Sequence, residues 1–421
     1  SIRITAIYIL QMLKTMFPAV NCIVTHARER RNGVFEQGIF LLICALSIVS
    51  CRHDIPMVNL GIDDTYAVER MRTLILRPAF DGEAYQWWMG DSLLSEQREL
   101  VFCQKQVGTY HLSLKIIDKD NPVQQPIEVV VWEEQVAYSP YISQVLEYVP
   151  APGQFVNLMP LYEPGDTYHT MLQKVQNAIM GTNKELISLG AWGGYVTFGF
   201  DHSVVNTPHA KDFLIEGNAF LSSAMQKGGS SEPGIVMVSV DMNQNGVADD
   251  VFYQLKGSEY YHPQTLHDYA ITYYRTPANH VPQGNKKAPI TDSTYIRWTD
   301  NQGMQGYVKK NSFHQQDYFP QWLSDSTLSF VGTCLPDNAY DRDGDGMYYV
   351  QTFFGEGYAD CNPNDSVELC SFDIDWAIDS LGNAVKLPCV DFIRVYTGVN
   401  NECGWLGETS TEISHAQDLN L

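Results

Sequence analysis

The chain contains few basic residues for its length. Lysine and arginine number 27 against 49 aspartates and glutamates, which gives a formal net charge of −22 over 421 residues. A surface this acidic repels the phosphates of nucleic acids and the head groups of anionic membranes. We therefore expect no nucleic-acid partner, whereas divalent cations should be attracted.

Common motifs of catalysis and zinc binding are also missing. The sequence has no G-x-S-x-G, H-E-x-x-H, G-x-x-x-x-G-K-[ST] or G-x-G-x-x-G pattern, and no two cysteines have CxxC spacing. These absences leave serine hydrolases, zinc peptidases, nucleotide-binding proteins and zinc ribbons without support. A pair of carboxylates for glycoside hydrolysis could still lie among so many acids, but no spacing locates it.

The apolar run over residues 39–50, IFLLICALSIVS, is short for a membrane span. It follows Arg28, Arg30 and Arg31, as the apolar part of a signal peptide follows its basic part. We expect residues 1–50 to be a leader region. The segment SIVSC resembles a bacterial lipobox, which implies lipidation of Cys51; an ordinary signal peptide that contains a cysteine is the alternative. Residues 51–67 would then form a lipidated tether.

Residues 68–138 carry short strand-like stretches separated by turn residues. RTLILRPAF and GTYHLSLKIID alternate apolar and polar residues, AYQWWMG is aromatic, and IEVVVWEE closes the set. This spacing predicts a β-sandwich of immunoglobulin size. The series YQWWMG followed by VGTYHLSLKIID resembles the PKD family, although the family's FGDG turn is MGDS here.

Residues 139–421 predict a second and larger β domain. After a Pro- and Gly-punctuated linker over residues 139–157, EPGDTYHTMLQKVQNAIMG has the apolar spacing of one helix, which Asp166 or Thr167 can cap. About nine strand-like stretches follow between residues 187 and 398, as in a jelly roll. The sequence thus predicts an all-β protein: an N-terminal PKD/Ig-like β-sandwich followed by a larger jelly-roll-like β-sandwich with one helix.

The stretch DMNQNGVADD, residues 241–250, has the pattern of a calcium loop. Oxygen side chains occupy positions 1, 3 and 5, and a glycine follows at position 6. The alternative is a hairpin turn made by Asn-Gly. In the calcium interpretation the ion is structural, and its ligands are Asp241, Asn243, Asn245, the backbone carbonyl of Val247, and Asp249 or Asp250.

A second, weaker calcium candidate and several tryptophans complete the set of candidate residues. DRDGDG repeats the 1, 3, 5 spacing at Asp341, Asp343 and Asp345, but it can equally be a solvated turn. Tryptophans can stack on a sugar or another flat ligand, although each can also belong to the core. The candidates for ligand binding are Trp192, Trp298, Trp322, Trp376 and Trp405.

Taken as a run, several stretches resemble the PKD-like cell-surface lipoproteins of gut Bacteroidetes. They include SQVLEYVPAPGQFVN, ISLGAWGGYVTFGFDHSVVN, SSEPGIVMVSVDMNQNGVADDVFYQLKGSEY and VYTGVNNECGWLGETSTEI. Some members of this family are encoded beside outer-membrane vitamin B12 receptors. The resemblance implies a lipid anchor, an outer-membrane location at the cell surface or on the periplasmic face, and capture of a corrinoid, alone or together with an outer-membrane receptor.

Three functions compete at this point. A non-catalytic binding protein would hold a glycan or a corrinoid, a glycan-active hydrolase would release products, and a structural receptor subunit would offer an apolar patch to a partner. The lack of catalytic motifs favours the binding protein.

Overall fold

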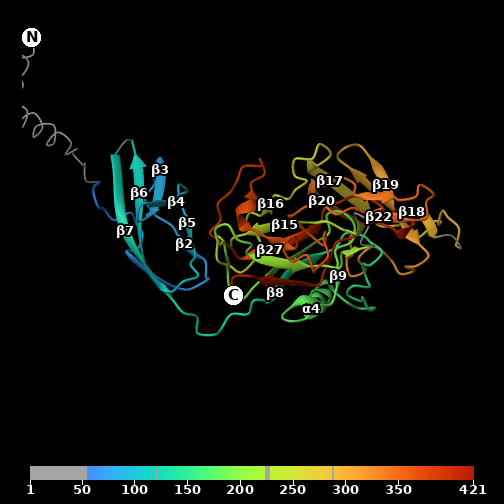
Figure 1. Cartoon of the computed structure of the whole chain (residues 1–421), viewed down its shortest axis with the longest axis horizontal. Coiled ribbons are helices and arrows are strands. Elements are labelled where there is room, and N and C mark those ends of the chain that lie inside the picture. Colours follow the sequence, from blue (N-terminus) through green and yellow to red (C-terminus); the bar gives the residue numbers. More distant parts are fainter. Residues whose placement is uncertain (1–54, 120, 223–227, 287–288) are drawn as a thin grey trace, which may run out of the picture. The chain divides into compact units, whose positions relative to one another are not determined.

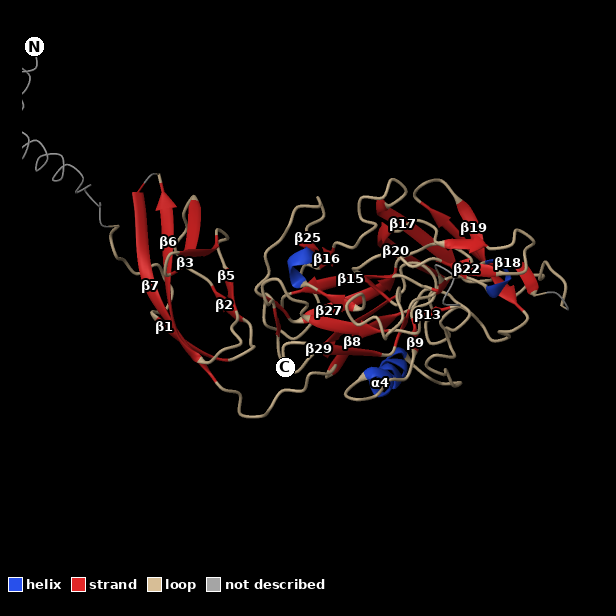
Figure 2. Ribbon diagram, viewed as in Figure 1, coloured by secondary structure: helices blue, strands red, loops and turns tan. Residues whose placement is uncertain are grey.

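The computed structural model describes residues 55–119, 121–222, 228–286 and 289–421. The predicted leader over residues 1–50 and Cys51 lie outside these residues. The chain divides into two units, residues 1–56 and residues 57–421. The described regular structure is nearly all β, with α4 (Tyr168–Ile179) as its one α-helix, as Figure 2 shows. The predicted all-β fold class is therefore confirmed.

No helix in the described ranges is long and apolar enough to cross a membrane.

The first β-sandwich follows from alternating sequence. β6 buries every second residue, at Leu112, Leu114 and Ile116, because successive side chains of a strand point to opposite faces. These residues pack around Trp87. A five-stranded sheet has the order β1-β7-β6-β3-β4, and β2 pairs with β5 (Figure 1). The strands are β1 (Thr65–Glu69), β2 (Leu74–Leu76), β3 (Ala84–Met89), β4 (Ser92–Ser95), β5 (Leu100–Phe102), β6 (Gly108–Asp118) and β7 (Asn121–Trp132).

This sandwich begins earlier than the sequence predicted. Leu60 and Ile62 are buried in its core, and β1 starts at Thr65 and pairs in parallel with β7. The tether predicted up to residue 67 is therefore wrong from residue 57 onward. Asn59, Gly61, Asp63 and Asp64 interrupt the apolar residues of this segment, so its sequence looks like a linker.

The second β domain is built on one antiparallel sheet of order β25-β16-β15-β27-β10-β8, with β23 also paired to β15. β15 places Val236 and Val238 in a first core and Ile235 in a second core, so this sheet is buried on both faces. Its strands are β8 (Gln144–Val149), β10 (Tyr195–Gly199), β15 (Gly234–Ser239), β16 (Tyr253–Leu255), β23 (Tyr358–Ala359), β25 (Ala377–Ile378) and β27 (Phe392–Thr397).

Smaller sheets and α4 cover the two faces of this central sheet. The first core also holds residues of α4 and of the sheet β24-β12-β29. The second core holds residues of the sheet β19-β18-β17-β20. The three-stranded sheet consists of β24 (Ser371–Phe372), β12 (Phe213–Glu216) and β29 (His415–Asp418), and the four-stranded sheet of β19 (Gln305–Asn311), β18 (Ile290–Asp300), β17 (Leu266–Tyr274) and β20 (Thr327–Cys334).

Short strands complete the second domain. One sheet has the order β13-β14-β22-β21, and two pairs are β11 with β26 and β9 with β28. Their bounds are β9 (Ile187–Ser188), β11 (Val204–Val205), β13 (Phe220–Leu221), β14 (Gly229–Ser230), β21 (Ala339–Asp341), β22 (Tyr349–Gln351), β26 (Cys389–Val390) and β28 (Glu412–Ile413). Two 3-10 helices are η2 (Ile374–Trp376) and η3 (Gly404–Leu406).

The predicted helix is confirmed, but the predicted linker is not. Thr167 caps α4, accepting from the backbone N–H of Thr170, and Met171, Val175 and Ile179 are buried. Residues 139–157 contain β8, which pairs with β10 and contacts α4 (Figure 1). The prolines that flank this strand on both sides made the whole segment look like a linker.

Candidate functional site

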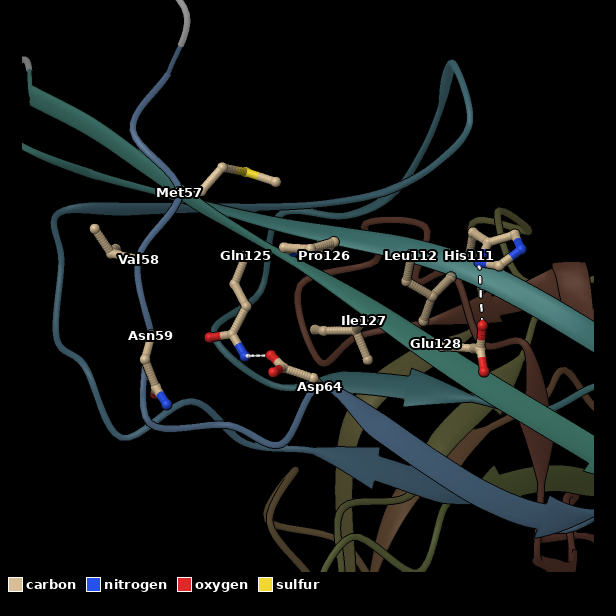
Figure 3. Close-up of a pocket in the computed structure, with 10 residues that line it drawn as sticks. All are labelled: Met57, Val58, Asn59, Asp64, His111, Leu112, Gln125, Pro126, Ile127 and Glu128. Carbon is tan, nitrogen blue, oxygen red and sulfur yellow. Dashed lines mark hydrogen bonds and ion pairs between the residues drawn. The ribbon is translucent and has the colours of Figure 1, made fainter.

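A groove of about 560 Å³ lies on the first sandwich, between residues 57–59 and strands β6 and β7 (Figure 3). Its buried amide is fully engaged: Gln125 accepts from the N–H of Leu60 and donates to Ile62 and Asp64. His111 and Glu128 lie 3.8 Å apart at its rim. None of the residues that line this groove has a buried side-chain polar atom without a partner, so its chemistry does not point to a ligand.

A second cavity, of about 350 Å³, lies within the second β domain and is the candidate functional site. We call it the tryptophan cavity. Residues from three distant parts of the chain line it: the loop between β9 and β10, the β18–β19 hairpin, and the segment that follows β27. They are Ala191, Trp192, Trp298, Gly306, Tyr307, Val308, Lys309, Asn400, Asn401, Glu402 and Glu408.

Trp298 owes its position to a glycine on the neighbouring strand. Trp298 on β18 stands opposite Gly306 on β19 in the antiparallel register. A Cβ atom at position 306 would lie 2.4 Å from Cζ2 of the indole ring, so only glycine lets the ring lie over the neighbouring strand. The next residue, Tyr307, is 39% exposed. The hairpin thus presents a flat aromatic surface to the cavity.

Trp192 also lines the cavity and lies in the tightly packed loop between β9 and β10. Its ring is fully buried and meets Tyr269 edge to face, with ring centroids 4.7 Å apart. Its carbonyl accepts a hydrogen bond from the Tyr273 hydroxyl. The indole Nε1 of Trp192 has no hydrogen-bond partner. A buried indole N–H usually finds an acceptor, so this donor is unusual.

Two more residues of the cavity have buried polar atoms without a partner. Asn401 donates to Asp337 and Asn338, but its Oδ1 accepts from no group. Glu408 accepts from the N–H of Gln154, whereas its Oε2 has no partner. A buried polar group left unpaired costs about 1–3 kcal/mol. With Trp192, three residues that line this cavity therefore each have one buried polar atom without a partner.

The charges of the tryptophan cavity offset one another. The Lys309 ammonium forms an ion pair with Glu402, whose other oxygen accepts from the Lys309 N–H. Burial, together with the nearby carboxylates of Glu402 and Glu232, raises the pKa of Glu408 to about 8. Glu408 is therefore protonated at neutral pH, and the lining carries no net charge.

The state of Glu408 predicts how stability depends on pH. Its pKa is near 4.5 when unfolded and about 8 when folded, so the folded state binds the proton more tightly between these values. This contribution to stability is present below pH 4.5 and is lost as pH rises toward 8. Melting temperatures at pH 5 and pH 8 should therefore differ less in Glu408→Gln than in the wild type.

Glu368→Gln serves as the control, because Glu368 is exposed, and this variant should keep the wild-type difference. If the difference in Glu408→Gln also equalled that of the wild type, the raised pKa of Glu408 would be contradicted.

The structure places the sequence-predicted tryptophans in different surroundings. Trp192 and Trp298 line the tryptophan cavity. Trp322 stacks on Tyr148 against the first core, with ring centroids 5.9 Å apart. Trp405 in η3 donates to the Met347 carbonyl, and the ring of Trp376 lies under the Lys211 ammonium. These last three are not among the residues that line the cavity.

The predicted calcium loop over residues 241–250 folds on its own side chains. Asp241 accepts from the N–H groups of Asn245 and Gly246, and Asp249 accepts from the side-chain amides of Asn243 and Asn245. Gly246 has a φ of +73°, which glycine adopts without strain. Asp250 accepts from the Met242 N–H, and Val247 lies exposed at the tip. This closed turn suits both interpretations, and calcium binding here stays a prediction.

Replacing Asp241 tests this loop. Asp241→Ala removes a carboxylate ligand, so we expect it to lose part of the rise in melting temperature that calcium causes in the wild type. Both proteins are melted in calcium and in chelator, because the substitution also removes two hydrogen bonds that do not depend on the ion. An equal calcium-induced rise in the two proteins would contradict a site in this loop.

The second candidate loop has a competing ion pair. Arg342 forms two hydrogen bonds with Asp343, and this pairing lowers the pKa of the Asp343 carboxyl. Asp341 accepts from the Gly346 N–H through one oxygen, while its other oxygen has no partner. Asp345 accepts from the Met347 N–H. Calcium at Asp341, Asp343 and Asp345 stays a prediction as well.

The six cysteines of the described ranges are all buried and none forms a disulfide. They are Cys103, Cys334, Cys361, Cys370, Cys389 and Cys403.

The chain matches no protein-family model and no curated protein. Among solved structures it is similar to a SusE-like protein, at 8% identity and a TM-score of 0.23 over 85% of this chain and 95% of that one. It is also similar to carbohydrate-binding modules from the β-sandwich superfamily, at 8% identity and a TM-score of 0.14 over 83% and 91%. The chain is also similar to a quinonprotein alcohol dehydrogenase-like protein from Bacteroides thetaiotaomicron, at 11% identity and a TM-score of 0.16. This match covers 59% of this chain and 47% of that one. TM-scores below 0.5 do not show a shared fold, so the residues of the site must indicate the function.

Proposed function

We propose that this protein binds a neutral glycan in the tryptophan cavity and does not turn it over. The observation that carries the proposal is that one lining combines flat aromatic rings with three residues that each have an unpaired polar atom, Trp192, Asn401 and Glu408. A sugar ring offers an apolar face for stacking and hydroxyl groups that both donate and accept hydrogen bonds. It therefore matches both parts of this lining.

The charge and size of the cavity narrow the ligand further. Because Lys309 offsets Glu402 and Glu408 is protonated, an anionic or cationic ligand would have no counter-charge. A volume of about 350 Å³ is at the lower end for ligand pockets. One or two sugar units suit this volume better than a corrin ring does. A corrinoid, which the family resemblance implied, is thus the weaker candidate.

Hydrolysis of a glycan is a second candidate function, because Glu402 and Glu408 both border the cavity. Glu408 is protonated at neutral pH, and Glu402 is ionised in its ion pair with Lys309. Glycosidases likewise use one protonated and one ionised carboxyl group. The lysine bound to Glu402 weakens it as a nucleophile or base, so we favour binding without turnover.

The sequence pattern, and not the structure, supports the cellular setting. The basic residues, the short apolar run and the SIVSC segment suggest an exported lipoprotein anchored through Cys51. In this setting the protein would capture its glycan at the outer membrane, on the cell surface or the periplasmic face. A receptor partner rests on the family resemblance alone.

Thermal melts of the exported chain, residues 52–421, with added ligands test the proposal. Neutral glycans should raise the melting temperature, since a ligand that binds only the folded state stabilises it. Uronic-acid glycans and cobalamin should not, and chromatography should show the glycan unchanged. The proposal would be contradicted if only cobalamin raised the melting temperature, or if none of the added ligands raised it. Product release that Glu408→Gln abolishes would establish the hydrolase instead.

A further inference from the structure

Three acidic side chains that are far apart in sequence meet inside the second β domain. Glu232 precedes β15, Asp360 follows β23, and Glu412 begins β28. One carboxylate oxygen of each lies within 4.8 Å of the other two. Asp360 and Glu412 are almost fully buried, and Glu232 is partly buried. We call these three residues the carboxylate triad.

Hydrogen bonds fix the triad but do not use all of its oxygens. Asp360 accepts from the N–H groups of Asn218, Ala219 and Glu412. Oε1 of Glu412 accepts from the Ser410 hydroxyl, whereas its Oε2 is buried without a partner. This unpaired oxygen is a second sign that the cluster takes a further group, because a buried carboxyl oxygen rarely remains without a partner.

No side chain supplies the positive charge that the triad needs. Within the described ranges, no lysine, arginine or histidine forms an ion pair with Glu232, Asp360 or Glu412. Burying several like charges without a counter-charge is strongly unfavourable.

We infer that the carboxylate triad binds one divalent cation, and that this cation is Ca²⁺. All candidate ligands are hard oxygens, which Ca²⁺ and Mg²⁺ prefer over softer metals. Mg²⁺ normally keeps several water molecules, whereas the triad lies among buried side chains, so the larger and less hydrated Ca²⁺ fits better. One Ca²⁺ offsets two of the three charges, and the backbone N–H groups around Asp360 help to stabilise the third.

This site is separate from both loops with Asp-x-Asx-x-Asx spacing and does not depend on a glycan. Its three ligands come from three segments, so binding would connect β15, β23 and β28. Ser410, which hydrogen-bonds both Glu232 and Glu412, lies two residues after Glu408 of the tryptophan cavity. The cation would therefore also stabilise the segment that carries Glu408.

Glu412→Gln is the substitution that tests the triad. The new amide keeps an oxygen for the Ser410 hydroxyl and places an N–H₂ group at the position of the unpaired oxygen, so the fold should be retained. To remove any contribution of the 241–250 loop, the full exported chain is compared as Asp241→Ala and as Asp241→Ala with Glu412→Gln. Each is melted in Ca²⁺ and in chelator, and bound calcium is counted after dialysis.

The expected result is that Asp241→Ala still melts several degrees higher in Ca²⁺, whereas the double variant shows a smaller calcium-induced rise and binds about one ion fewer per chain. If Asp241→Ala shows no rise, or if both proteins rise equally, the triad is neutralised by protons and the inference is wrong. Should the double variant fail to fold, Glu232→Gln replaces Glu412→Gln, because its amide oxygen can still accept from the Ser410 N–H.

Discussion

Gly190→Ala should destabilise the second β domain by about 2–5 kcal/mol, because it adds steric clash to backbone strain. Gly190 has a φ of +71°, which L-residues other than glycine seldom adopt. A Cβ atom at this position would lie 1.9 Å from the carbonyl oxygen of Ala151. The loop that holds Trp192 is thus pressed against the residues that follow β8. The measurement is the free energy of unfolding from denaturant titration.

Gly303→Ala separates the two causes of this loss. Gly303 has a similar φ of +79°, but no atom lies within 4 Å of the added Cβ. It therefore reports the backbone strain alone, about 1–2 kcal/mol. If the two variants lose equal stability, the loop relaxes without cost and close packing does not fix the position of Trp192.

Trp298→Ala is expected to weaken glycan binding by about 2 kcal/mol, roughly thirtyfold in Kd. Buried aromatic anchors commonly carry most of the energy of an interface, and Trp298 supplies the flat surface opposite Gly306. The Kd is measured by titration calorimetry with the glycan that gives the largest thermal shift. A melt of the variant without ligand confirms that it is folded.

Trp132→Ala is the matched control. Trp132 is 37% exposed at the end of β7 in the first sandwich and is not among the residues that line the tryptophan cavity. Its removal should leave the Kd within a factor of about two, since surface substitutions away from a site usually change free energies by less than 0.5 kcal/mol. A loss of affinity in Trp132→Ala, or none in Trp298→Ala, would place the binding site elsewhere.

Regular alternation made part of the fold predictable from sequence. GTYHLSLKIID buries every second residue as β6, and the spacing of Met171, Val175 and Ile179 predicts α4. β8 and the segment over residues 57–67 were missed for a common reason. Their apolar residues are interrupted by turn-forming residues or flanked by proline, and only tertiary packing shows that they belong to a sheet or a core.

The candidate site was predictable only in part. Trp192 and Trp298 could be predicted as ligand-binding residues because tryptophan is rare and suits ligand stacking. Glu408 and Asn401 do not, because no local spacing marks them among 49 acidic residues and many amides. The same holds for the carboxylate triad, where Glu232, Asp360 and Glu412 share no local motif. Such sites arise when loops converge, and the spacing of residues along one segment cannot reveal them.

The most direct test of glycan binding in the tryptophan cavity is a crystal structure of residues 52–421 with the neutral glycan that raises the melting temperature most. We predict a sugar ring against Trp298, with hydroxyl groups bonded to Asn401 Oδ1 and Glu408 Oε2. A glycan bound in the groove of the first sandwich, or at any place outside the tryptophan cavity, would contradict it.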